Sequence, residues 1–91
     1  MVYIVNYDIK DAGRKGAFLN EAKKIGDIIQ YLPHALFIHN LDINQNQATI
    51  YNQLKQITSD EDLFIVSQAP LNQMSGWLTS SVVDWLKSHN Q

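Results

Sequence analysis

The residue best placed to do chemistry is Asp8, which follows the β-branched and aromatic run Val2-Tyr3-Ile4-Val5-Asn6-Tyr7. Carboxylates are ligands that Mg²⁺ and Mn²⁺ prefer, and a divalent cation at a strand end can polarise a phosphate and activate water. One carboxylate makes a poor metal site, but a twofold axis that brings two copies of Asp8 together would supply the second ligand. On local sequence alone we favour a structural role, since an aspartate at a strand end commonly caps the turn that follows it.

Three basic residues close to Asp8, namely Lys10, Arg14 and Lys15, are candidates for contact with the phosphates of RNA or DNA. Residues 1–24 hold five basic and three acidic side chains, whereas residues 25–91 hold two basic and six acidic ones, for a net charge of −2. A mild positive patch at one end can touch phosphate, but by itself it is no DNA-binding footprint. A solvated helix face explains the same pattern.

Other catalytic patterns are missing from the sequence. With no cysteine, the chain has no thiol nucleophile, disulfide framework or zinc ribbon. It also has no G-x-S-x-G elbow, no GxGxxG and no P-loop, and Gly13-Arg14-Lys15-Gly16 offers at most a phosphate contact at a helix start. His34 and His39 are five residues apart, so along a strand they point to opposite faces. Asp11 could join Asp8 as a ligand, although a turn or N-cap position explains it as well.

Alternating strands and helices are expected to position these side chains. Apolar residues spaced i, i+1, i+4, i+7 predict one helix around residues 18–25, with Gly26 as a left-handed C-cap, and a second around residues 50–57, capped by Asn44 or Asn46. Ser81, with Asp84 three residues later, predicts the start of a final helix over residues 82–88. The expected strands are residues 2–7, 27–31, 35–39 and 63–66, with a tight reversal at residues 32–34.

This order predicts an α+β fold over residues 1–91 as a single domain. It is the ferredoxin-like βαββαβ arrangement, an antiparallel four-stranded sheet with two helices on one face, followed here by a C-terminal helix. The chain is 45% hydrophobic and 18% charged, which is typical of globular proteins, and no apolar run is long enough to cross a membrane. A cytoplasmic location is the expectation that fits the absence of cysteine.

The predicted strands are apolar on both faces, whereas a sheet covered on one face should alternate apolar with polar residues. The second face therefore needs a cover, either the C-terminal segment with Trp77, Val82, Trp85 and Leu86 or a second copy of the chain. We favour a homodimer, with Trp77 and Trp85 as packing anchors. Aromatic residues could instead form a base-stacking platform on an open sheet face, although filling a core or an interface is their more common role; they are Tyr3, Tyr7, Phe37, Phe64 and Trp77.

Several short motifs resemble one superfamily. The segment Tyr3-Ile4-Val5-Asn6-Tyr7-Asp8-Ile9 is similar to the first strand of the small CRISPR-associated adaptation nucleases and of the VapD-type toxins. A closer resemblance is to the SinR-like small proteins of that superfamily. It is carried by the Tyr-Asp pair, a lysine-containing helix, a glycine before the short strand, Tyr31-Leu32, Gly76-Trp77 and Asp84-Trp85-Leu86-Lys87.

The resemblance implies a ferredoxin-like homodimer packed sheet to sheet. For the nuclease relatives it also implies an endonuclease that cleaves phosphodiester bonds of RNA or DNA with Mg²⁺ or Mn²⁺ held by paired aspartates, and the aspartate matches Asp8 here. The alternative is a non-catalytic dimeric binding or inhibitor protein on the same fold that engages a protein or nucleoprotein partner.

Overall fold

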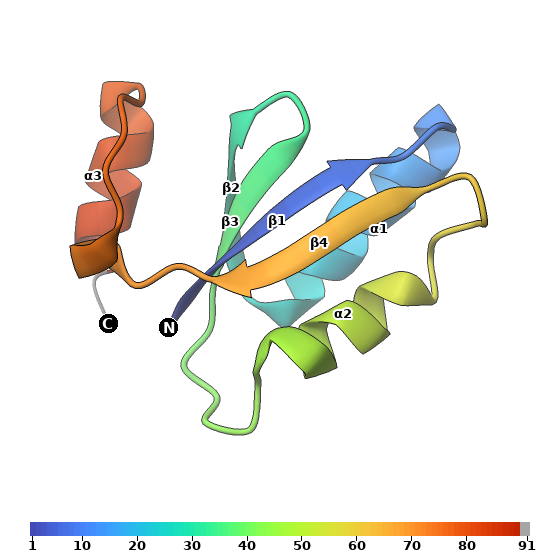
Figure 1. Cartoon of the computed structure of the whole chain (residues 1–91), viewed down its shortest axis with the longest axis horizontal. Coiled ribbons are helices and arrows are strands. Elements are labelled where there is room, and N and C mark those ends of the chain that lie inside the picture. Colours follow the sequence, from blue (N-terminus) through green and yellow to red (C-terminus); the bar gives the residue numbers. More distant parts are fainter. Residues whose placement is uncertain (90–91) are drawn as a thin grey trace.

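A central strand paired on both sides organises the fold. The computed structural model describes residues 1–89 and contains β1 (Val2–Asp8), α1 (Ala12–Ile25), β2 (Asp27–Leu32), β3 (Ala35–His39), α2 (Gln47–Lys55), β4 (Leu63–Gln68), the 3₁₀ turn η1 (Leu71–Gln73) and α3 (Ser80–Ser88) (Figure 1). The strand order is β2-β3-β1-β4 and every neighbouring pair is antiparallel. The ferredoxin-like arrangement predicted from the sequence is confirmed. Within the described residues, no helix combines the length and apolarity needed to cross a bilayer.

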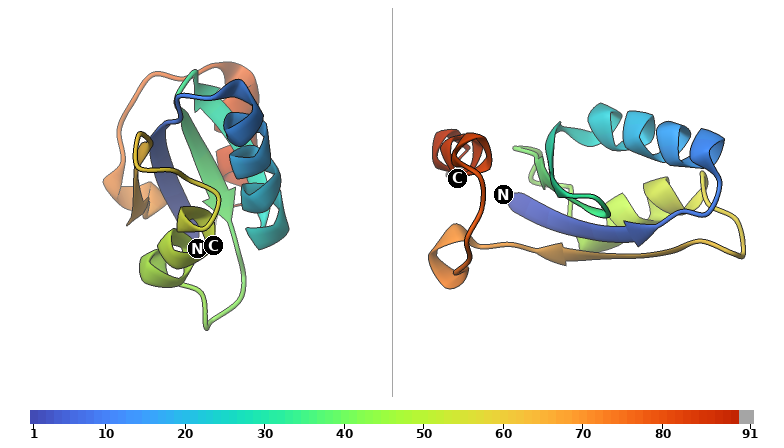
Figure 2. Two further views of the ribbon diagram at one scale, coloured as in Figure 1. Left: turned by 90° about the vertical axis from the view of Figure 1, so that its right-hand side faces the viewer. Right: turned by 90° about the horizontal axis from the view of Figure 1, so that it is seen from above.

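The main core lies between one face of the sheet and the helices α1 and α2, which lie side by side on that face (Figure 2). Phe18 of α1 and Ile50 and Leu54 of α2 are fully buried against Val5 and Leu36 of the central strands. The spacing i, i+4 places Ile50 and Leu54 on one side of α2, which is why the apolar pattern of the sequence located this helix.

The N-terminal ends of the three α-helices match the sequence predictions in two of three cases. Asp11 is the N-cap of α1 and accepts a hydrogen bond from the Arg14 amide at 2.9 Å. Asn46 caps α2 in a reciprocal capping box with Thr49. The expectation that Ser81 caps the last helix is wrong, because α3 begins at Ser80 with Thr79 in the N-cap position.

Gly26 does not adopt the left-handed conformation expected of a helix C-cap. Its φ is 177° and its ψ is −170°, an extended backbone that leads directly into β2. A glycine is needed here because of a close approach: a Cβ atom would overlap the carbonyl oxygen of His39, at the end of β3. The Asn40 side-chain amide donates to the Ile25 carbonyl at the same junction. The glycine thus lets the end of α1 lie directly on the end of β3.

The second face of the sheet is covered in part, by α3 and the segment that precedes it. Val2 and Phe37 are buried there beneath Val82 of α3. Trp85 stacks on Phe37 with ring centroids 6.3 Å apart, so this tryptophan is a packing anchor as predicted. Figure 1 places α3 beside the end of the sheet at which β1 begins. The C-terminal segment therefore supplies part of the cover that the two-faced strands require.

The last turn of α3 is attached to the sheet through histidines. The Nε2 atom of His89 lies 3.0 Å from Asp27 Oδ2, and its Nδ1 atom lies 2.8 Å from the Trp85 carbonyl oxygen. The Asp27 carboxylate, followed by this carbonyl, raises the pKa of His89. His39 meets the same ring edge-on at 4.7 Å, and burial lowers the pKa of His39. These contacts fix the end of α3 above β2 and β3.

Candidate functional site

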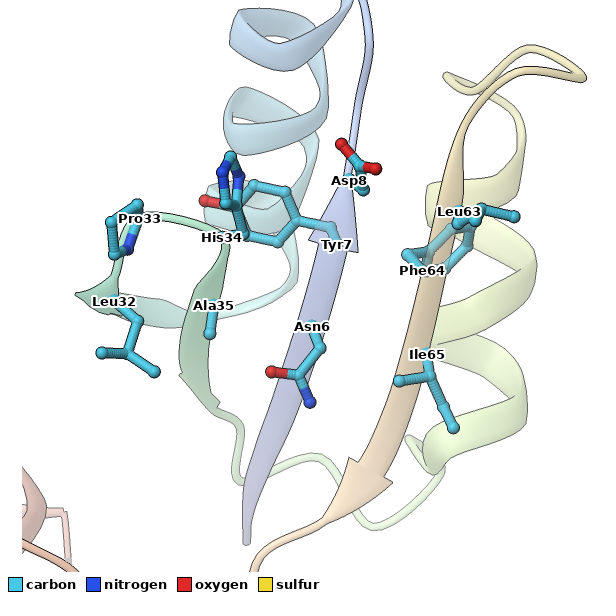
Figure 3. Close-up of a pocket in the computed structure, with 10 residues that line it drawn as sticks. All are labelled: Asn6, Tyr7, Asp8, Leu32, Pro33, His34, Ala35, Leu63, Phe64 and Ile65. Carbon is cyan, nitrogen blue, oxygen red and sulfur yellow. The ribbon is translucent and has the colours of Figure 1, made fainter.

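Asp8 ends β1 on the sheet face opposite α1 and α2, in register with Leu63 of β4 (Figure 3). Its side chain is 52% exposed, and its Oδ2 atom lies 2.7 Å from the Nζ atom of Lys10. This hydrogen bond and the charge of the carboxylate raise the pKa of Lys10. Within residues 1–89, the Asp8 carboxylate accepts a hydrogen bond from the side chain of Lys10 and none from a backbone amide. Asp8 therefore does not cap the turn that follows β1.

The basic residues beside Asp8 are largely engaged with carboxylates. Lys10 pairs with Asp8, and the Arg14 guanidinium lies 2.9 Å from Asp62 and 3.6 Å from Glu61. The hydrogen bond to Asp62 is the main reason that the pKa of Arg14 is raised. The two carboxylates already balance the charge of Arg14, which weakens its attraction for a phosphate. Among the three predicted phosphate contacts, Lys15 alone forms no ion pair within residues 1–89.

Asp62 was not singled out by the sequence, although its carboxylate is the most heavily bonded in the described chain. Its side chain is fully buried and accepts hydrogen bonds from the Arg14 guanidinium and from the backbone amides of Lys10 and Ser59, each at 2.9 Å. These donors, Arg14 foremost, hold the pKa of Asp62 well below its usual value of 3.8. The carboxylate joins the start of β4 to the turn between β1 and α1.

The residues at Asp8 do not by themselves fit a divalent cation. Within residues 1–89, no three His, Cys, Asp or Glu side chains lie close enough together to hold a metal ion. The one carboxylate present has an ammonium group as its neighbour, and that positive charge opposes a second cation at the same oxygen. A cation at Asp8 would need further ligands from a second copy of the chain, as the sequence already suggested.

The sheet surface around Asp8 is open and mainly apolar. We call it the open half of the sheet; it comprises Asn6, Asp8, Leu63 and Ile65, with Leu32 at its margin. Leu63 and Ile65 alternate with helix-facing residues along β4 and are 68% and 62% exposed. A shallow recess of about 660 Å³ lies over this surface, walled on one side by the turn between β2 and β3 (Figure 3).

The aromatic residues do not form a base-stacking platform on this surface. Tyr3 and Tyr7 are buried beneath the helices, and Phe37 is buried beneath α3. The packing role weighed for these three side chains is therefore confirmed. Trp77, predicted as a packing anchor, is instead 99% exposed in the segment between η1 and α3, so that prediction is wrong. Trp85, which does pack, lies within α3 three residues after Val82, whereas Trp77 precedes that helix.

Two helices on one face of the β2-β3-β1-β4 sheet, and a second face half covered by α3, define a ferredoxin-like α+β protein. No protein-family model matches the chain, and neither does any curated protein sequence. Its structure is similar to the crystal structure of a hypothetical protein, TT1823, from Thermus thermophilus. The TM-score is 0.60 at 19% sequence identity, and the match covers 86% of this chain and 93% of that one. A similarity at this level shows that the two proteins share a fold, and it carries no information about activity.

Proposed function

We propose that this chain is a dimeric binding protein whose two copies pack sheet to sheet through the open half of the sheet. The observation that supports the proposal is the exposure of Leu63 and Ile65, two large aliphatic side chains on one face of one strand. A contiguous patch of exposed apolar side chains usually marks a site of interaction with another molecule. A second copy would cover the part of the face that α3 leaves bare.

The charge distribution favours different roles for the two sides of the molecule, dimerisation through the sheet and partner binding through the helices. The open half carries one charge, that of Asp8, which Lys10 neutralises, and nucleic acid demands a surplus of positive charge. The exposed lysines Lys23 and Lys24 lie on α1, on the opposite side of the sheet. In the dimer we propose, the sheets meet each other and the helices face outward. Lys24 pairs with Glu21 of the same helix, and Lys23 forms no ion pair within residues 1–89. These lysines then face an acidic protein or a nucleoprotein partner, in the cytoplasm that the sequence leads us to expect.

A charge placed in the open half should abolish the dimer. We expect wild-type protein at tens of micromolar to have twice the chain mass by light scattering and the Ile65→Asp variant to have the mass of one chain, because an aspartate cannot be buried there without a partner. Ile43→Asp is the matched control, since Ile43 is 95% exposed in the loop before α2, and it should remain dimeric. A monomeric wild-type protein at these concentrations would refute the proposal.

A second candidate function is the divalent-metal-dependent cleavage of RNA or DNA that the family resemblance implies. It is favoured by the position of Asp8 on the open half, since a sheet-to-sheet dimer would bring this residue of each copy into the same interface region. Mg²⁺ or Mn²⁺ would then be held by the two Asp8 carboxylates. The arrangement in a single chain does not suffice for this activity, so the dimer is a condition of both candidates.

Cleavage assays on labelled single- and double-stranded RNA and DNA separate the two candidates. Wild type and Asp8→Asn, purified side by side, should be tested with Mg²⁺, with Mn²⁺ and with EDTA. For a binding protein we expect no cleavage by either protein and unchanged dimer mass in the variant. Metal-dependent cleavage by wild type that Asp8→Asn loses would establish the second candidate, whereas equal cleavage by both would identify a contaminating nuclease.

A further inference from the structure

A second cavity, of about 910 Å³, lies on the sheet face that α3 partly covers. Ile4 and Phe37 line it from the sheet, Leu86 lines it from α3, and residues 71–78 line it from the connection between β4 and α3. Leu32 is the one residue that it shares with the recess over the open half. Its volume falls within the range of about 300–1,000 Å³ that is typical of sites for small organic molecules.

The larger part of the lining is apolar, and part of it is aromatic. Tyr31 stacks on Phe37 with ring centroids 4.2 Å apart, and both rings line the cavity. Trp77 lines it from the connecting segment, although its side chain is 99% exposed. A molecule bound beside this indole would remove apolar surface from water, which favours binding. The body of a ligand that fits this cavity is therefore apolar.

The polar side chains of the lining are suited to an anionic group. Asn72, Gln73 and Ser75 can each donate a hydrogen bond, and all three are exposed on the connecting segment. Lys87 of α3 is the one charged residue that lines the cavity, and within residues 1–89 it forms no ion pair. Among the described residues, no Asp or Glu lines the cavity. An ammonium group with neutral donors around it favours a carboxylate.

We infer that this cavity binds a small organic carboxylate with an apolar body, such as a medium-chain fatty acid. The apolar body lies against Tyr31 and Phe37, Trp77 covers it from the connecting segment, and the carboxylate pairs with Lys87. A polyanion such as a nucleic acid would find a single cation here, and an uncharged molecule would leave the Lys87 ammonium without a counter-charge. All the lining elements belong to one chain, so this site is complete without a second copy and is independent of the proposed homodimer.

Titration calorimetry with decanoate tests the inference, and decanol is the matched ligand without the charge. At neutral pH we expect wild type to bind decanoate about fivefold more tightly than decanol, as for one partly exposed ion pair. Lys87→Gln should lose this preference and bind decanol as wild type does. Lys23→Gln is the matched control variant, because Lys23 is an exposed lysine of α1 that does not line the cavity, and it should retain the preference.

Tryptophan fluorescence reports where the ligand lies. The exposed indole of Trp77 should shift its emission to shorter wavelengths when decanoate covers it. Trp77→Phe should keep its fold and still bind decanoate, but it should lose most of this shift. Trp85 is present in both proteins and packs on Phe37, so the difference between the two proteins isolates the contribution of Trp77.

Three results would overturn the inference. Wild type that binds decanoate no more tightly than decanol, or not at all, would show that Lys87 does not recognise a carboxylate. Binding with the same emission shift in wild type and Trp77→Phe would place the ligand at another site. Binding by the Ile65→Asp variant but not by wild type would show that a second copy, and not a small molecule, covers the cavity in the dimer. Because the expected results do not depend on the mass of the protein, failure of the homodimer is detected separately by light scattering.

Discussion

Replacing Gly26 by alanine is expected to lower the melting temperature by at least about 10 °C. The new Cβ atom would fall on the backbone carbonyl oxygen of His39, and backbone cannot move aside as a flexible side chain can. The new atom would force the end of β3 away from the junction of α1 and β2. The pairing of Asp27 with His39, next to Gly26, would be lost. Thermal unfolding followed by circular dichroism measures the effect.

Gly16 provides the matched control for this substitution. It lies within α1, and a Cβ there meets no atom within 4 Å. Because alanine is the better helix former by about 1 kcal/mol, Gly16→Ala should raise the melting temperature by several degrees. Opposite signs for the same chemical change would establish that Gly26 is required for close approach. A melting temperature for Gly26→Ala equal to that of wild type would contradict the packing described at this junction.

A second large loss of thermal stability is expected when Asp62 is replaced. Asp62→Asn should lower the melting temperature by at least about 10 °C, since the Arg14 guanidinium loses its buried counter-charge and two backbone amides lose a charged acceptor. Asp60→Asn is the control, because Asp60 is exposed two residues away, and its melting temperature should stay close to that of wild type.

The difference between wild type and Asp62→Asn should also depend on pH. The pKa of Asp62 in the folded chain lies well below the ordinary value of 3.8, so the unfolded chain binds the proton more readily than the folded one. The stabilisation by Asp62 is therefore complete above about pH 5 and is lost progressively as the pH falls below 4. Melting curves at intervals from pH 7 to pH 2 should show the two proteins converging. A gap that stays constant over this range would mean that the carboxylate is not held by its donors as described.

The sequence was sufficient for the architecture because its signals are local. The strand at residues 35–39 has the predicted bounds, and the apolar spacing around Phe18 and Ile50 identified both core helices. The need for a cover on the second sheet face was also visible, since the alternation of residues along a strand assigns each side chain to a face. These features depend on neighbours within a few positions along the chain.

The features missed depend on contacts between distant segments. The sequence predicted that Arg14 contacts phosphate. Its actual partner, Asp62, is 48 positions away along the chain, and no local sequence pattern indicates this pairing. Gly26 has the spacing of a left-handed cap, and only the approach of His39 reveals its actual role. Trp77 and Trp85 were both predicted to be packing anchors, yet only Trp85, which lies within α3, reaches Phe37.

The central position of β1 also governs when this protein can fold during its synthesis. Val5 pairs with Leu36 on one side and with Val66 on the other, so β1 is translated well before either partner strand. At about 5–20 residues per second, the ribosome needs roughly 3–12 s to pass from β1 to β4. Throughout that delay the nascent chain carries an apolar strand with an unpaired edge, a natural substrate for chaperones. Completion of the sheet is therefore a late event, and the many long-range pairings place folding on the slow side for a chain of this length.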